Sequence, residues 1–194
     1  MLHVVIGLGA NLGDPAAAFT TGLNDIASIG DIVAVSRLWR TRPLGPDQPD
    51  YCNAAALIGW PVDLPTLLQA CRNFEVAAGR DRDTEQRWGP RVLDLDLLIA
   101  RNLIWRSPEL LLPHPRFHER AFALVPAAEL VPDWVHPIVG RTIAELAEEV
   151  LSADPKALIS SEPFPYAPES RQPVRTTIAG LNRKGAKGAK PSHD

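Results

Sequence analysis

The order of strand-like and helix-like segments is the feature that most constrains the fold of this chain. Short apolar runs predict four strands, at residues 3–9, 31–40, 52–60 and 92–100. A helical pattern follows the first run, opened by Asp14-Pro15, and another follows the third run, opened by Asp63. This βαββαβ order is typical of a ferredoxin-like α+β fold, a two-layer sandwich of helices on an antiparallel sheet.

The remaining chain predicts an extension and a tail. We expect a hairpin around residues 101–102, a helix near 118–128 and a last helix over 142–151. Beyond that point prolines are frequent, periodicity is lost, and residues 151–194 hold seven Lys or Arg against four Asp or Glu. The pattern predicts one domain over residues 1–151 and a proline-rich, basic, mobile tail over 152–194.

Composition and charge exclude several classes of protein. With 45% hydrophobic and 22% charged residues, the chain of 194 residues is typical of a globular domain. Its net charge of -3 provides no overall field for nucleic acid or anionic lipid. No stretch approaches the ~18 apolar residues of a spanning helix, so we expect a cytoplasmic protein. Two cysteines, Cys52 and Cys71, without a C-x-x-C motif argue against a disulfide framework or structural zinc.

The strongest sign of chemistry is the pair Asp94 and Asp96 in the last predicted strand. Residues two apart on a strand share a face, so both carboxylates point to one side while the flanking leucines face the core. Two like charges about 6–7 Å apart repel unless a cation lies between them. A solvated strand face is the alternative. Two carboxylates on a rigid strand suit Mg²⁺, because phosphate and water oxygens can complete its coordination shell.

Two groups of basic residues flank this strand. Four arginines precede it: Arg80, Arg82, Arg87 and Arg91. Their planar guanidinium groups fit phosphate, and the spacing predicts a loop that closes over metal-bound polyphosphate, although a solvated loop is also possible. After the strand, His114 stands between two prolines, and Arg116 and Arg120 fall four apart at the start of the next predicted helix. Such a helix start favours an anion, and ordinary surface charge is the alternative.

Residues 41–55 predict a site for a flat ring. Pro43, Pro46 and Pro49 stiffen this segment. Tyr51 and Asn53 lie on one side of the strand that follows, which places an aromatic ring beside an amide with both donors and an acceptor. That pairing suits a heterocycle with amide-like edges, and a structural role for each residue is equally open.

The glycine-rich start of the chain does not predict a dinucleotide site. Its spacing in GLGANLG is G-x-G-x-x-x-G, and no parallel strand with an acidic tip follows. The glycines instead predict a tight turn and a close approach of the backbone to a ligand.

Taken together, five stretches closely resemble the 6-hydroxymethyl-7,8-dihydropterin pyrophosphokinase (HPPK) family of folate biosynthesis, which transfers diphosphate from ATP to a pterin hydroxymethyl group and releases AMP. The stretches are GLGANLGD, SRLWRTRPLGPDQPDYCNAA, E-x-x-x-G-R-x-R from Glu75, RWGPRVLDLDLLI and LPHPRFHERAF. They occur in the family's order and cover roughly residues 4–135.

The resemblance implies a role for each matching residue, with ATP as co-substrate and no obligate protein partner. Two Mg²⁺ ions would be held by Asp94 and Asp96. The implied catalytic residues are Arg82, Arg91, Asp94 and Asp96. ATP would be contacted by Glu75, Arg80, Arg82, Arg91, His114 and Arg120. The pterin would be contacted by Gly7, Thr41, Pro43, Leu44, Tyr51, Asn53, Trp88 and Phe122.

The chain departs from the family pattern at a few positions. The family's usual Thr-Pro-Pro is Thr41-Arg42-Pro43 here, Ala10 replaces a serine, and Arg72 replaces a glutamine. The arginine loop is one residue longer than in better-known members, which leaves open whether Arg80, Arg82 or Arg87 contacts the phosphates.

Two other functions remain possible on this fold. One is an RNA-binding or ligand-sensing module, and an RNA reader would show aromatic residues and basic charge on its sheet. The other is an inactive nucleotide-binding relative, against which the retained aspartates, His114 and the arginines argue.

Overall fold

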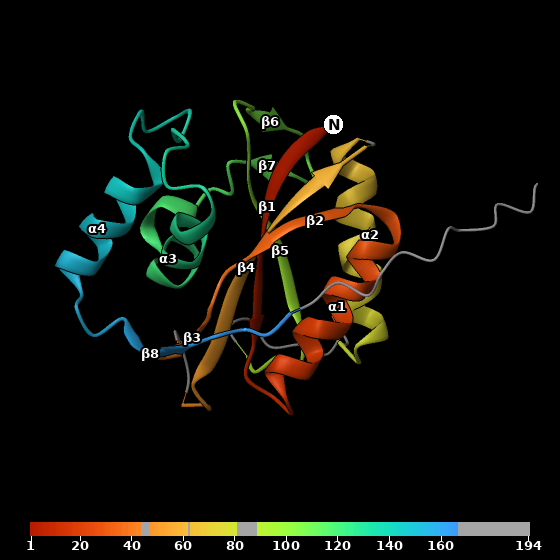
Figure 1. Cartoon of the computed structure of the whole chain (residues 1–194), viewed down its shortest axis with the longest axis horizontal. Helices are drawn as coiled ribbons and strands as arrows, with labels where there is room; N and C mark the ends of the chain where they lie inside the picture. The colour runs from red at the N-terminus through yellow and green to blue at the C-terminus, as the bar shows by residue number, and fades with distance from the viewer. Residues whose placement is uncertain (44–46, 62, 81–88, 167–194) are drawn as a thin grey trace, which may run out of the picture.

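An antiparallel sheet forms the centre of the molecule, as the computed structural model shows for residues 1–43, 47–61, 63–80 and 89–166 (Figure 1). Its strands are β1 (Leu2–Ala10), β2 (Asp31–Val35), β3 (Leu38–Thr41), β4 (Tyr51–Trp60), β5 (Asp94–Ala100) and β8 (Leu158–Glu162). Their order is β5-β1-β4-β3-β8, with β2 also paired to β4, and every pairing is antiparallel. This arrangement confirms the predicted ferredoxin-like fold.

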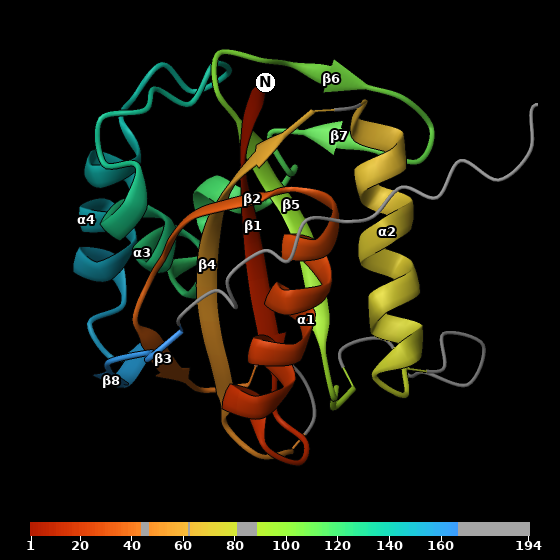
Figure 2. The same cartoon turned by 45° about the vertical axis from the view of Figure 1, so that its right-hand side comes forward.

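Helices cover both faces of the sheet. The helices α1 (Pro15–Ile29) and α2 (Leu64–Ala77) lie on one face, and α3 (Ala121–Leu130) and α4 (Ile143–Ala153) on the other (Figures 1 and 2). Strand β1 is buried on both of its faces. Val4 and Ile6 pack in the core under α1 and α2, whereas Val5 packs on the other face with Leu124 of α3. Burial on both faces explains why β1 is a nearly continuous apolar run. In the described ranges no helix is long and apolar enough to cross a membrane.

The helices begin where their capping residues predict. Asp14 and Asp63 each accept a hydrogen bond from the backbone N–H three residues later, at 3.1 and 2.9 Å. Thr142 and Glu145 form a reciprocal capping box at the start of α4. These side chains satisfy N–H groups that have no partner inside the helix, which is why the sequence locates these helix starts well.

The second predicted strand is interrupted in the structure and forms both β2 and β3. At the interruption the Ser36 hydroxyl accepts a hydrogen bond from the Ala55 N–H (2.8 Å). Glu129 of α3 accepts hydrogen bonds from the Arg37 N–H (2.9 Å) and from Trp39 Nε1 (2.7 Å). The prediction of one strand was wrong because side chains from distant segments satisfy the backbone there.

The segment before α3 also differs from the prediction. A short 3₁₀ turn, η1 (Phe117–Glu119), precedes α3, and Arg120 has an extended backbone with φ -115° and ψ 108° between the two. Arg116 and Arg120 therefore flank the turn and do not share a helix face, which corrects the expectation. The buried Phe117 ring, 0% exposed, anchors the turn against the core.

The chain reverses near the predicted hairpin. Asn102 takes a positive φ of 54°, which an asparagine tolerates well. The two-stranded pairing follows slightly later, between β6 (Trp105–Arg106) and β7 (Leu111–Leu112).

The predicted domain boundary after residue 151 is too early. Strand β8 pairs with β3, and the Phe164 ring packs edge-on against Phe19 of α1 with centroids 6.3 Å apart. The Tyr166 hydroxyl donates a hydrogen bond to Asn24 Oδ1 (3.2 Å). Residues 152–166 thus belong to the packed domain. The rest of the predicted tail, 167–194, lies outside the described residues.

Candidate active site

A cavity of about 270 Å³ opens on the face of the sheet that α3 covers. Its wall is formed by Gly9, Thr41, Arg42, Tyr51, Asn53, Arg91, Asp94, Asp96, Arg120 and Phe122. These residues come from β1, β3, β4, β5 and the start of α3, together with two adjoining segments. The sequence predicted eight of them; Gly9 and Arg42 were missed.

Strand register and a glycine shape the floor of the cavity. Gly9 of β1 lies opposite Asn53 of β4 on one side and Asp94 of β5 on the other. A Cβ on Gly9 would stand 3.4 Å from Asn53 Oδ1 and 3.8 Å from the Asp94 Cβ, so glycine keeps the floor open between them. Gly7 was the glycine predicted at the pterin. A Cβ there would meet the Leu98 side chain at 3.1 Å, and Gly9 takes the place on the cavity wall instead.

One end of the cavity, which we call the amide end, consists of Thr41, Tyr51, Asn53 and Phe122. Asn53 Nδ2 donates to the Thr41 hydroxyl (2.8 Å), and both residues are at most 5% exposed. The Tyr51 hydroxyl donates to the Gly89 carbonyl (2.8 Å). These hydrogen bonds hold an amide and an aromatic ring in fixed positions before any ligand arrives.

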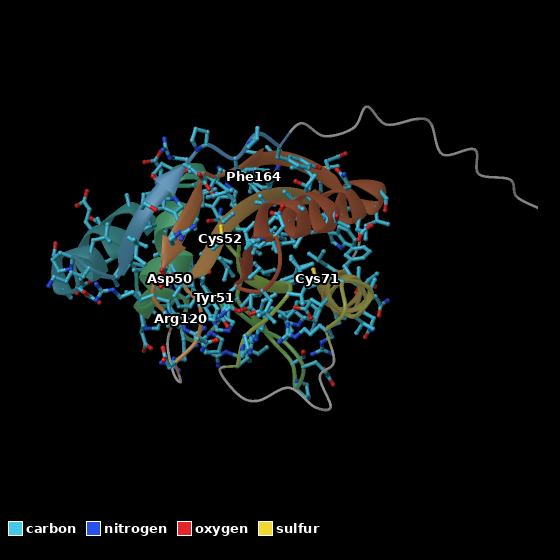
Figure 3. The ribbon with its side chains drawn as sticks, turned by 90° about the horizontal axis from the view of Figure 1, so that it is seen from below. Asp50, Tyr51, Cys52, Cys71, Arg120 and Phe164 are labelled. Atoms are coloured by element: carbon cyan, nitrogen blue, oxygen red, sulfur yellow. The ribbon has the colours of Figure 1, made fainter. Side chains whose placement is uncertain are left out.

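Arg120 joins the amide end to the rest of the cavity. Its guanidinium lies over the Phe122 ring, 5.5 Å from the ring centroid. Figure 3 shows Arg120 and Tyr51 close to one another, although Arg120 precedes α3 and Tyr51 begins β4. A cation is thus placed beside the aromatic side chains.

The opposite end, which we call the acid end, consists of the wall residues Arg91, Asp94 and Asp96, together with Glu75 and Arg80, which are linked to Asp94 by ion pairs but do not line the cavity. Asp94 accepts hydrogen bonds from Arg80 Nη1 and Arg91 Nη1, both at 2.5 Å. Glu75 of α2 is 1% exposed and accepts from the same Arg80 nitrogen (2.7 Å). The Oε1 atom of Glu75 also accepts a hydrogen bond from the backbone N–H of Leu95 in β5 (2.8 Å). This network fixes α2 to the first residues of β5.

The positive charge near Asp96 is not enough to keep its carboxyl group at its usual pKa. The pKa of its carboxyl group is raised to about 7, first by lost hydration and then by the nearby Asp94 and Glu75, while Arg91 and Arg120 oppose the shift. The carboxylate form is therefore disfavoured by lost hydration and by like charges. A cation next to Asp96 would relieve both costs.

The oxygen donors of the acid end fit the Mg²⁺ site that the sequence predicted at Asp94 and Asp96. Asp94 and Asp96 share a strand face and are hard oxygen donors, and the half-buried Asp96 lies beside the like charges of Asp94 and Glu75. Within the described ranges no cluster of three or more His, Cys, Asp or Glu could form a cage made only of protein ligands. Mg²⁺ commonly binds one or two carboxylates and completes its shell with substrate phosphates and water.

His114 lies next to the acid end but does not line the cavity. Its N–H donates to the Leu98 carbonyl (2.7 Å), and its Nδ1 accepts from the Arg116 N–H (3.2 Å). Burial lowers the pKa of the imidazole, and Arg120 lowers it further. The ring is therefore neutral at pH 7 with its proton on Nε2, a hydrogen-bond donor suited to a phosphate oxygen.

Asn11 is a positioning residue that the sequence reasoning missed. Its Oδ1 accepts from the Arg91 N–H (2.7 Å), and its Nδ2 donates to Gln48 Oε1 (3.0 Å) and the Pro49 carbonyl (3.1 Å). It is 7% exposed and connects the segment before β4 with the arginine segment before β5. Asn11 lies inside the GLGANLG motif, in which the spacing of the glycines alone does not reveal this role.

Several predicted site residues are not placed at the cavity. Pro43 is described and follows Arg42, but it is not part of the wall. Leu44, Arg82, Arg87 and Trp88 lie outside the described residues, so their predicted contacts stay predictions.

Comparison with known proteins identifies the family. The chain matches the profile of the family described as 7,8-dihydro-6-hydroxymethylpterin-pyrophosphokinase (HPPK) over residues 5–132. The chain belongs to this family. Two relatives named 2-amino-4-hydroxy-6-hydroxymethyldihydropteridine pyrophosphokinase match strongly. That of Synechocystis sp. is 38% identical, covering 75% of each chain, and that of Methylorubrum extorquens is 41% identical, covering 75% of this chain and 91% of its own.

Solved structures agree on the fold. Wild-type HPPK-DHPS of Plasmodium falciparum aligns with a TM-score of 0.60 and 13% sequence identity. The alignment covers 78% of this chain and 45% of that longer chain, so this HPPK-family chain spans less than half its length. At this identity the likeness supports the fold alone.

Proposed function

We propose that this chain transfers diphosphate from ATP to the hydroxymethyl group of 6-hydroxymethyl-7,8-dihydropterin in folate biosynthesis, yielding the pterin diphosphate and AMP. The observation that carries the proposal is a single cavity whose amide end suits a flat heterocycle and whose acid end suits metal-bound phosphates. Membership of the HPPK family and the names of its relatives support the same reaction.

The pterin is proposed to lie at the amide end. Asn53 uses one N–H on Thr41, which leaves its carbonyl oxygen and second N–H to pair with the amide-like edge of the ring. Tyr51 and Phe122 supply aromatic surface for the ring faces. Because Thr41 fixes the orientation of the Asn53 amide, the donor and acceptor positions are set before the substrate binds.

ATP is proposed to lie at the acid end, with two Mg²⁺ ions held by Asp94 and Asp96. When bound, Mg²⁺ supplies charge neutralisation and polarises the phosphoryl oxygens. Arg80 and Arg91 are already held beside Asp94 at 2.5 Å, so incoming phosphates meet oriented guanidinium groups. Glu75 acts as a positioning residue because it holds Arg80 without lining the cavity.

The protein contributes positioning and charge. The pterin hydroxyl oxygen forms a bond to the β-phosphorus while the bond from that phosphorus to the oxygen of AMP breaks, and the hydroxyl proton is released. Such transfers need little covalent participation by the protein, so orientation of the two substrates accounts for much of the rate. Arg91, Arg120 and the neutral His114 are proposed to contact phosphate oxygens at this end.

The RNA-binding alternative needs a broad open sheet face, and in the described part of the chain helices cover most of both faces. Helices α1 and α2 cover one face, and α3 and α4 the other (Figure 2). The open part of the α3 face carries Asp94 and Asp96, which would repel a phosphate backbone. We therefore propose small-molecule substrates without nucleic acid, membrane or obligate protein partners, and a cytoplasmic location.

The direct test is incubation of the purified chain with ATP, Mg²⁺ and 6-hydroxymethyl-7,8-dihydropterin. We expect AMP and pterin diphosphate in equal amounts, and no AMP when the pterin is omitted. Formation of ADP with a pterin monophosphate, or no pterin-dependent AMP, would contradict the proposal.

A further inference from the structure

Arg42 is a wall residue of the cavity for which the proposed mechanism has no use. It is exposed and directly follows Thr41, the residue that holds Asn53. The HPPK family pattern has a proline at this position, so the guanidinium group of Arg42 is a departure of this chain from that pattern. Together with Arg91 and Arg120 it gives the cavity wall three cationic side chains.

The three arginines differ in position and in partners. Arg91 is paired with Asp94 at 2.5 Å at the acid end, and Arg120 lies over Phe122. Arg42 stands at the amide end, and no carboxylate of the described ranges lies within ion-pair distance of it. Its charge therefore faces the end of the cavity where the pterin is proposed to bind.

The backbone on both sides of Arg42 is restrained. Thr41 pairs with Tyr51 in the β3–β4 ladder and accepts the Asn53 hydrogen bond. Pro43 on the other side disfavours a helical backbone at Arg42. The start of the side chain is thus placed relative to the amide end, and the long flexible remainder can reach an anion there.

We propose that Arg42 binds the diphosphate of the product, pterin diphosphate, and so makes the cavity distinguish the phosphorylated pterin from the unphosphorylated one. This inference rests on the proposed function. Before transfer the diphosphate belongs to ATP at the acid end, and the pterin is uncharged. After transfer the negative charge is attached to the pterin itself, a few bonds from the ring that the amide end holds. In the product, a guanidinium at that end can contact a phosphate that is covalently attached to the bound ring.

The alternative is an arginine that only contacts solvent, and the two cases predict different binding. We would measure equilibrium binding of two probes, 6-hydroxymethyl-7,8-dihydropterin and its diphosphate, each with Mg²⁺, to the wild-type chain and to Arg42→Gln. We expect the diphosphate to bind about tenfold more weakly to Arg42→Gln, the size of a partly exposed charged contact, while the unphosphorylated pterin changes less than about twofold. Arg42→Lys should fall between the two because it retains the charge but not the planar fork.

Arg40→Gln is the matched control. Arg40 lies two residues earlier, is exposed, and lines a separate groove with Ser160 and Glu162, so its replacement changes net charge equally. Both probes should bind Arg40→Gln as they bind the wild type. Equal weakening of both probes by Arg42→Gln, or no change in either, would overturn the inference. Failure of the wild-type chain to bind the diphosphate or to form AMP would instead count against the proposed function.

Discussion

The two ends of the cavity are built on different physical principles. At the amide end, Asn53 Nδ2 donates a hydrogen bond to the Thr41 hydroxyl oxygen (2.8 Å), and neither side chain carries a formal charge. At the acid end, Glu75, Asp94 and Asp96 face the closely paired Arg80 and Arg91, and the pKa of Asp96 is raised to about 7. The amide end is uncharged and is oriented without a ligand, whereas the acid end is completed by added positive charge.

This difference separates the contributions to stability from those to chemistry. Buried, satisfied hydrogen bonds stabilise the fold modestly and hold their groups in place. A half-buried carboxylate next to like charges, such as Asp96, costs free energy in the folded state and is retained where it serves function. The acid end should therefore govern turnover, and the amide end should govern affinity for the pterin.

The largest expected effect is at Asp96. Asp96→Asn should lower the rate of AMP formation on the order of 10³-fold or more, because a ligand of the metal is lost. It should not lower the midpoint of thermal unfolding, since it removes a desolvated charge next to Asp94. Near-normal turnover would exclude the proposed metal role, and a large loss of stability would contradict the contrast between the ends.

Arg91 should show that the acid end acts in the transition state. Arg91→Ala should lower kcat about 10²-fold and change KM for ATP much less, because charge on the transferring group grows as the reaction proceeds. Steady-state kinetics with saturating pterin provides the measurement. If KM for ATP alone rises, Arg91 contributes only to binding of the ground state.

Asn11 should link the two ends. Asn11→Ala removes three side-chain hydrogen bonds, to Arg91, Gln48 and Pro49, so we expect higher KM values for both substrates and a loss of about 1–3 kcal/mol in the free energy of unfolding. Asn24→Ala is the control, since Asn24 of α1 accepts a hydrogen bond from the Tyr166 hydroxyl and does not line the cavity. That control should affect only stability; equal KM changes in both variants would argue against a link.

Thr41 should affect the amide end alone. Thr41→Val removes the acceptor for Asn53 Nδ2 while keeping the side-chain shape, so KM for the pterin should rise about tenfold and KM for ATP should stay constant. Thr41→Ser, which keeps the hydroxyl, should restore the pterin KM. A parallel rise in both KM values would mean that the ends are not separable at this residue.

The smallest effect concerns a histidine outside the cavity. His136 is 2% exposed, and burial lowers its pKa, with His118 lowering it further. The unfolded chain takes up this proton more readily, so the free energy of unfolding should fall as pH drops below about 6.5. Denaturant unfolding at pH 8 and pH 6 should show a smaller decrease for His136→Asn than for the wild type. Equal decreases would exclude His136 as a source of the pH dependence.

Local sequence patterns predicted much of the fold and part of the site. Asp14, Asp63 and Thr142 located three helix starts because a cap bonds backbone only three residues away. The single strand over 31–40 and the boundary at 151 were wrong for the opposite reason. Glu129 of α3 and the pairing of β8 with β3 decide those features, and both contacts join segments about 90 or more residues apart.

The sequence by itself determined which residues share a face. The period of a strand is two, so Asp94 with Asp96, and Tyr51 with Asn53, must point to one side wherever the strand lies. Only the tertiary structure decided what faces them. Glu75 reaches Asp94 through Arg80, and Asn11 reaches Arg91 across the molecule, because antiparallel register and helix packing bring these distant segments together. Spacing along a strand fixes the side of the sheet to which each side chain points. The charge balance around that side chain and its hydrogen-bond partners depend on which other segments pack nearby.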